Sequence, residues 1–231
     1  MADAWLPGAV RLRSKHDGGS LRGGAPRAVW HTSENDPDAI SARSVAQRLE
    51  QQGRNAHLVW NPRSGEVVQM VPATRAACLL PDGVGREGRR CFQIVVVGFA
   101  QEPFTDGAMD GIEKIVRWLD AWQVPRRWPA GEPLPSPEAY HATRGRRWWA
   151  RGGHFGVSQV PHTNDPAPGA IDIRKIIGPD PAGVPRPRMA SGEVTPPAGP
   201  DGLLGRRLTP DKAEAPPQPR GPAHVQASSR S

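Results

Sequence analysis

The segment from Arg151 to Asp172 contains the side chains best suited to chemistry in this sequence. It places His154, His162 and Asp165 in a short stretch that is rich in glycine and proline. Imidazole and carboxylate groups are two of the donor types that bind zinc. The glycines and prolines predict an irregular loop that presents side chains and adds little to a core. The first hypothesis from these residue types is therefore a metal site on this loop.

A further histidine, His31, stands near the end of a short apolar run at 27–32. That run reads as a buried strand, and a nearly continuous apolar run at 91–98 predicts the centre of a sheet. Runs at 56–61 and 66–71 flank a turn and predict a hairpin. Apolar residues at helical spacing predict helices at 41–53, 108–122 and 170–177. This mixture predicts an α/β fold with a central mixed β-sheet flanked by helices.

Composition divides the 231-residue chain into three parts. Residues 1–24 are a lead-in without hydrophobic periodicity. Residues 25–177 carry the predicted elements and form the expected domain. Residues 178–231 hold 12 of the 27 prolines and few large apolar side chains, which predicts a disordered tail.

The net charge of +7 raises the question of an anionic partner. The arginines are scattered and no nucleic-acid-binding motif accompanies them, so nucleic acid is not the favoured partner. Cys78 and Cys91 fit no metal motif or disulfide framework and are expected to be free thiols. We expect no membrane span, because no apolar run reaches about 20 residues. No signal peptide is recognisable, so the chain is expected to be made in the cytoplasm and to act outside the cell only after release or delivery.

The order of the motifs resembles a known family. A strand ending in His-Thr is followed by a helix and by Ala-His-Leu-Val-Trp-Asn-Pro, and the hairpin continues as Gly-Glu-Val-Val-Gln-Met-Val-Pro. Later come Gln-Ile-Val-Val-Val-Gly, a second helix, Gly-Gly-His-Phe-Gly-Val-Ser-Gln-Val-Pro and Pro-Gly-Ala-Ile-Asp. This order resembles the type 2 N-acetylmuramoyl-L-alanine amidases with the peptidoglycan-recognition-protein-like fold, and within them the actinobacterial and phage-lysin branch.

The resemblance implies a zinc hydrolase that cuts the amide between the lactyl group of N-acetylmuramic acid and L-alanine of peptidoglycan. In that family two histidines and an acid hold the zinc and leave one position open for water. The metal lowers the pKa of the bound water, and a glutamate accepts the proton. Zinc is therefore the cofactor that the resemblance implies.

Carried over residue by residue, the family pattern is retained only in part. His31 matches the first zinc ligand. Val157 and Ala167 occupy the positions of the other two ligands, and Val95 stands where the catalytic glutamate is expected. Asp165 replaces an auxiliary histidine. Valine and alanine cannot bind zinc and valine cannot move a proton, so the resemblance predicts a pseudo-enzyme in which zinc is absent or weakly bound.

Three functions follow from this pattern. The first is binding of peptidoglycan or a muropeptide without hydrolysis, in a groove lined by aromatic and imidazole side chains: Trp30, His57, Trp60, Trp148 and Trp149. The second is an active zinc amidase with a shifted ligand set of His31, His154 and Asp165. The third is a structural or adaptor part of a phage or phage-derived particle.

Overall fold

The computed structural model of the chain describes residues 2–142 and 144–178. All of them belong to one compact unit. The tail predicted at 178–231 lies, apart from its first residue, outside the described residues. The prediction of its disorder therefore stays a prediction.

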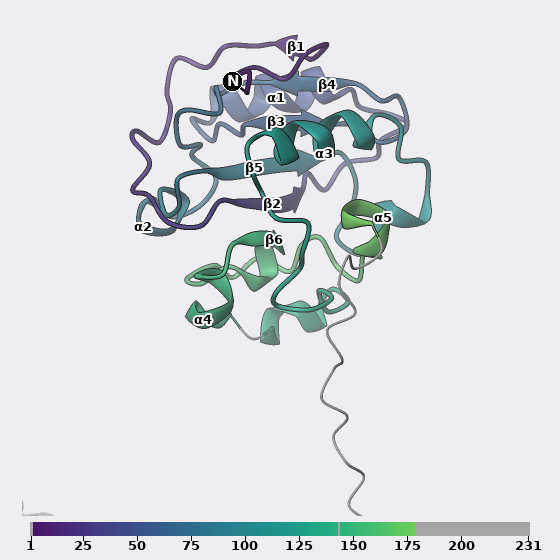
Figure 1. Cartoon of the computed structure of the whole chain (residues 1–231). Helices are drawn as coiled ribbons and strands as arrows, with labels where there is room; N and C mark the ends of the chain where they lie inside the picture. The colour runs from purple at the N-terminus through teal and green to yellow at the C-terminus, as the bar shows by residue number, and fades with distance from the viewer. Residues whose placement is uncertain (1, 143, 179–231) are drawn as a thin grey trace, which may run out of the picture. The chain divides into compact units, whose positions relative to one another are not determined.

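The described residues form one six-stranded sheet in the order β1-β4-β3-β5-β2-β6 (Figure 1). The β3–β4 pair is antiparallel and the other pairs are parallel. With helices packed on it, this sheet confirms the predicted α/β class and the predicted hairpin. The strands are β1 (Val10–Arg11), β2 (Arg27–Thr32), β3 (Leu58–Trp60), β4 (Val67–Gln69), β5 (Cys91–Val96) and β6 (Gly153–Gly156).

The centre of the sheet is formed by β5, as its apolar sequence predicts. Every residue of β5 is buried, and it pairs with β2 on one side and with β3 on the other. Because β2, β3, β5 and β6 all run parallel, their carboxyl ends lie at the same edge of the sheet. Ligands of open α/β sheets commonly bind at this edge.

Two ten-residue helices, α1 (Ala42–Gln51) and α3 (Ile112–Ala121), cover opposite faces of the sheet (Figure 1). Ser41 begins α1 because its hydroxyl accepts a hydrogen bond from the Ser44 amide. Shorter helical turns complete the fold: α2 (Asp82–Gly85), η1 (Phe104–Asp106), η2 (Glu138–His141), α4 (Arg146–Trp149), η3 (Val157–Gln159) and α5 (Arg174–Ile177).

Each face of the sheet has its own core. On the α3 side, Trp30 and Trp60 pack with Phe92 and with apolar residues of the helix. On the α1 side, Val59 and Val95 pack with the buried residues of α1. A third apolar cluster contains Val29 of β2, Cys91 of β5 and Phe155 of β6.

Three boundaries differ clearly from the prediction. The terminal helix predicted at 170–177 is shorter, because α5 spans only Arg174–Ile177. The second long helix begins at Ile112, after Gly111 at φ 85°, because residues 104–106 form the separate 3-10 turn η1. The lead-in at 1–24 contributes β1, which pairs with β4, and it buries Leu6. The lead-in is thus part of the folded unit, although its two-residue strand is too short to show a periodic pattern of apolar residues.

The segment at 151–172 differs most from its prediction as a loop outside the core. Its residues 152–161 are buried, and four of them form β6 beside β2. Gly152 and Gly153 have φ angles of 68° and 105°, and a Cβ at Gly152 would lie 2.6 Å from the Pro26 carbonyl oxygen. These glycines therefore allow β6 to approach the preceding chain closely.

Two further predictions concern the described part of the chain. Cys78 and Cys91 are free, as expected. Within residues 2–142 and 144–178, no helix is long and apolar enough to cross a membrane.

We predict that the fold loses stability as the pH falls from about 6.5 to 4.5. Burial lowers the pKa of His57 and of His154 to about 4 and that of His31 to about 3, so the unfolded chain binds more protons in this range. The stability is complete above the unfolded pKa near 6.5, and each histidine removes up to about 1.4 kcal/mol per pH unit below it. Urea denaturation at pH 7.5 and 5.0 measures the change.

The variant His57→Gln tests whether buried imidazoles cause the change. It should reduce the pH dependence, because it removes one of the three groups whose pKa is lowered by burial. Equal urea midpoints at the two pH values in the unaltered protein would contradict the prediction.

Candidate functional site

The candidate site lies at the carboxyl ends of the two central parallel strands. His31 of β2 is directly opposite Val95 of β5 in the parallel register, and both side chains line a cavity of about 200 Å³. Helix α1 forms one wall of this cavity, and Asp165 reaches it from the segment after η3. The lining residues are His31, Thr32, Ser33, Asn35, Val45, Arg48, Leu49, Gln52, Arg54, Leu79, Val95 and Asp165.

His31 is a buried, neutral imidazole in this cavity. Its side chain is 6% exposed, and its Nε2 atom has no hydrogen-bond partner among the described residues. Burial, followed by the positive charge of Arg54, lowers the pKa of His31 to about 3. A buried polar atom without a partner destabilises the fold unless something binds it, so Nε2 marks a position suited to a ligand atom or water.

Two guanidinium groups give the cavity a positive rim. Arg48 and Gln52 share a face of α1 with Val45 and Leu49, so the helix directs all four toward the cavity. Arg48 Nη2 donates to Asn35 Oδ1 at 2.8 Å. Within the described residues neither Arg48 nor Arg54 forms an ion pair. Their charges are thus available to an anionic group.

His154 lies on the other face of the sheet. It pairs in register with Ala28, two residues before Trp30, and its ring stacks on Trp30 and Trp128 with centroid distances of 6.1 and 5.9 Å. Trp30 Nε1 donates to its Nδ1 at 3.2 Å. His31 is the neighbour of Trp30 on the strand and therefore points to the opposite face. The structure does not bring His154 and His31 together.

Val157 and Ala167 lie close together beside the end of β2. Both are buried in the same apolar cluster, and the Ser158 amide donates to the Ala167 carbonyl at 2.9 Å. The β2–β6 register ends with Trp30 paired to Gly156, and Val157 begins the turn η3 directly after this pair. Asp165 Oδ1 accepts a hydrogen bond from the Ala167 amide. The two positions that the family pattern assigns to zinc ligands are thus occupied by apolar packing.

These residues do not fit a zinc ion. Among the described residues that line the cavity, His31 is the single imidazole and Asp165 the single carboxylate, and His154 is on the far side of the sheet. Among residues 2–142 and 144–178, no group of three His, Cys, Asp or Glu side chains is arranged to hold a metal. The shifted ligand set of His31, His154 and Asp165 is therefore not assembled here.

The predicted aromatic groove is replaced by core packing. Trp30 and Trp60 are fully buried on the α3 side, and the rings of His57 and Trp149 are almost fully buried. His57 Nδ1 accepts from the Gln93 amide, and Trp149 Nε1 donates to Glu87. Trp148 is partly exposed, beside Arg147 and Arg151. Four of the five predicted groove residues thus have interior partners, and the prediction that they line a groove is corrected.

The sequence patterns missed the polar residues that line the cavity. Arg48, Asn35 and Arg54 carry no motif, because a single arginine on a helix surface resembles any solvated side chain. Only their positions in the sequence could have identified them. Arg48 lies three residues after Val45, and Arg54 follows the glycine that ends α1. Residues that follow the end of a helix or strand often face the edge where sites form.

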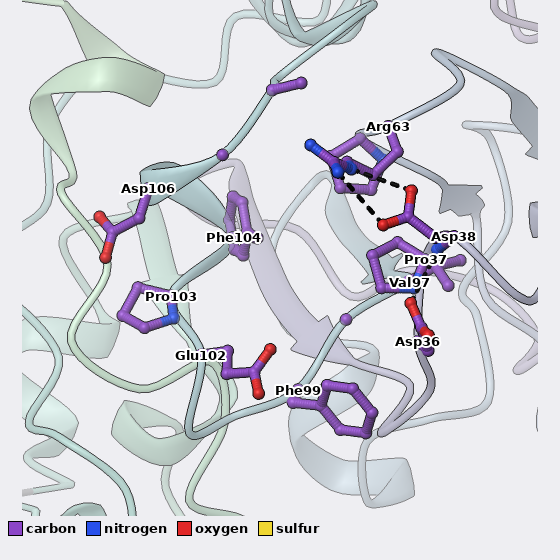
Figure 2. A pocket seen from close by; sticks show the side chains of 14 residues that line it. Asp36, Pro37, Asp38, Arg63, Val97, Phe99, Glu102, Pro103, Phe104 and Asp106 are labelled. Atoms are coloured by element: carbon purple, nitrogen blue, oxygen red, sulfur yellow. Dashed lines mark hydrogen bonds and ion pairs between the residues drawn. The ribbon is translucent and has the colours of Figure 1, made fainter.

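A separate cavity of about 310 Å³ lies between the turn at 36–38 and the segment at 97–108. Figure 2 shows its carboxylates, which belong to Asp36, Asp38, Glu102 and Asp106. Arg63 lies at one side of it and donates from Nε and Nη2 to Asp38 at 3.0 and 3.2 Å (Figure 2). This hydrogen-bonded pair lowers the pKa of Asp38. None of the residues predicted for the site lines this cavity.

No family model and no curated protein matches the chain. Among solved structures it is similar to the endolysin N-acetylmuramoyl-L-alanine amidase LysCS from Clostridium intestinale URNW, at 15% identity, 75% coverage of this chain, 95% coverage of that chain and a TM-score of 0.46. It is similar to Staphylococcus aureus hydrolase AmiA at 11% identity, with 75% and 70% coverage and a TM-score of 0.44. The Ph2119 endolysin of the Thermus scotoductus MAT2119 bacteriophage Ph2119 aligns at 15% identity, with 74% and 99% coverage and a TM-score of 0.40.

We predict that the purified protein contains far less than one zinc per chain after dialysis against zinc. The double variant Val157→His with Ala167→Asp should bind about one zinc, because it adds two ligands beside His31. Elemental analysis measures both. Adding His31→Ala to the double variant should abolish the gain. Stoichiometric zinc in the unaltered protein, or none in the double variant, would show that the positions are assigned wrongly.

Proposed function

We propose that this chain binds peptidoglycan fragments in the cavity around His31 and does not hydrolyse them. The observation that carries the proposal is the composition of that cavity. Its base holds an unpartnered imidazole nitrogen, its rim holds two guanidinium groups, and Val95 stands opposite His31. Such a cavity offers hydrogen-bond donors to an anion, and a valine stands where the family pattern places the catalytic glutamate.

The substrate class follows from the motif order of the sequence and from the charges of the cavity. Peptide stems of peptidoglycan carry carboxylates, and a guanidinium group can bind a carboxylate with two parallel hydrogen bonds. The neutral ring of His31 can donate or accept one further bond, depending on its tautomer. These groups suit recognition of a stem-peptide carboxylate.

The absence of hydrolysis is proposed from the same cavity. An amide is cleaved when a nucleophile is activated by a base or a metal and the developing oxyanion is stabilised. Val95 offers no base, and the apolar side chains of Val157 and Ala167 offer no ligand. Binding is therefore the function that the side chains of this site support best.

We predict that the protein is retained on insoluble peptidoglycan and releases no new amino groups from it. Replacing Arg48 and Arg54 by glutamine together should weaken the retention at least about tenfold, which corresponds to about 1.4 kcal/mol of lost charge-assisted hydrogen bonding. A sedimentation assay measures retention, and an amine-reactive reagent measures cleavage beside an active amidase.

The matched control is Arg13→Gln with Arg43→Gln. Both are exposed arginines that do not line the cavity, so their loss changes the net charge by the same amount without changing the site. Equal loss in the two double variants would attribute retention to charge alone. Release of amino groups by the unaltered protein would refute the absence of hydrolysis.

A further inference from the structure

A second cavity adjoins the one around His31. It measures about 420 Å³, and Thr32 and Asp165 line both cavities, so the two meet at these side chains. The second cavity is formed by the end of β2, the segment after β5 and the turn η2. Its lining residues are Thr32, Glu34, Ala100, Gln101, Ser136, Pro137, Tyr140, Asn164, Asp165 and Pro166.

The two cavities have opposite charge. The cavity around His31 carries Arg48 and Arg54, whereas no arginine, lysine or histidine is among the lining residues of the second one. Its charged groups are the carboxylates of Glu34 and Asp165. An anionic group would be repelled from this side and attracted to the other, so the pair of cavities favours a ligand with one neutral polar end and one anionic end.

The carboxylate of Glu34 is held in position at the junction. Glu34 has a φ angle of 54°, and its Oε1 accepts hydrogen bonds from the Ala100 amide at 3.0 Å and from the Thr32 hydroxyl. Asp165 is held similarly, because its Oδ1 accepts from the Ala167 amide at 2.9 Å. In both, the second carboxylate oxygen has no hydrogen bond to the described residues and can accept one from a ligand hydroxyl.

Tyr140 provides an exposed aromatic surface on the same side. It is the single tyrosine of the chain and is 45% exposed, although its neighbour Ala139 is fully buried and fixes the turn. The Tyr140 amide donates to the Pro137 carbonyl at 3.0 Å. An aromatic ring next to carboxylates and amides is the combination that binds a pyranose, since the ring packs on its C–H face while the polar groups bind its hydroxyls.

We propose that the cavity beside Tyr140 is a saccharide subsite, and that a bound muropeptide places its sugar there and its stem-peptide carboxylate at Arg48 and Arg54. This proposal rests on the proposed function and adds the orientation of the bound ligand across the two cavities. Gln101 and Asn164 supply amide groups to the sugar hydroxyls. The ligand crosses the junction at Thr32 and Asp165.

Nuclear magnetic resonance of tyrosine-labelled protein tests the proposal directly, because one tyrosine gives one set of ring signals. The probes are a muramyl peptide, the same stem peptide without sugar, and a free N-acetylglucosamine disaccharide. We expect the muramyl peptide and the disaccharide to shift the Tyr140 signals, and the free stem peptide to leave them unchanged. Shifts caused by the free stem peptide would mean that the acidic wall binds its amino group, which overturns the assignment.

Titration calorimetry with variants gives the second measurement. Tyr140→Ala should remove an affinity advantage of about fivefold that the muramyl peptide has over the free stem peptide, as expected for loss of one aromatic contact. Tyr140→Phe should retain it. The matched control is Leu134→Ala, since Leu134 is similarly exposed nearby and does not line the cavity.

The outcomes separate the two proposals. If Tyr140→Ala weakens both ligands equally or neither, the saccharide subsite is refuted while binding at the arginines stands. If neither peptide ligand binds the unaltered protein, the proposed function fails. In that case the disaccharide alone decides the subsite, which is refuted if the Tyr140 signals do not move.

Discussion

The alternation of side chains along β2 is the constraint on which the rest of this structure depends. Trp30 and His31 are neighbours in sequence and point to opposite faces of the sheet. Trp30 packs in the aromatic core under α3. A hydrogen bond and ring stacking with Trp30 hold His154 on the same face of the sheet. His31 is left on the α1 side with Val95. One strand thereby separates the two histidines that a shifted metal site would need.

The cavity around His31 combines burial with positive charge, and both act in the same direction on the imidazole. Each disfavours the charged ring, so His31 is neutral across the physiological range. The arginines can then bind an anion without a competing change in the protonation of the histidine. A carboxylate at Val95 would alter this balance by neutralising a guanidinium group. The apolar residue opposite His31 therefore bears on the proposed binding as well as on the proposed lack of hydrolysis.

The sequence predicted the elements with strong local patterns and missed those determined by distant contacts. The apolar run was sufficient to predict strand β5, and the helical spacing of apolar residues was sufficient to predict helix α1. The strand β6, in contrast, reads Gly-His-Phe-Gly and forms because its glycines allow a close approach to β2. The burial of Trp30 and Trp60 depends on tertiary packing, but part of it could be predicted from the strand pattern. Adjacent residues of one strand point to opposite faces of the sheet, so this rule, applied to residues 27–32, would have excluded Trp30 from a groove that contains His31.

The short strands at the two edges of the sheet limit how readily copies of this chain can associate by strand addition. The sheet ends in β1, with two residues, and in β6, with four. A strand pairs with a neighbouring molecule through a row of free amide and carbonyl groups, and so short an edge provides only a few of them. In β1 one of the two side chains is the charged Arg11, which lies against the ring of Trp5. The described part of the chain therefore presents no long, flat strand at either edge on which aggregation by strand addition could begin.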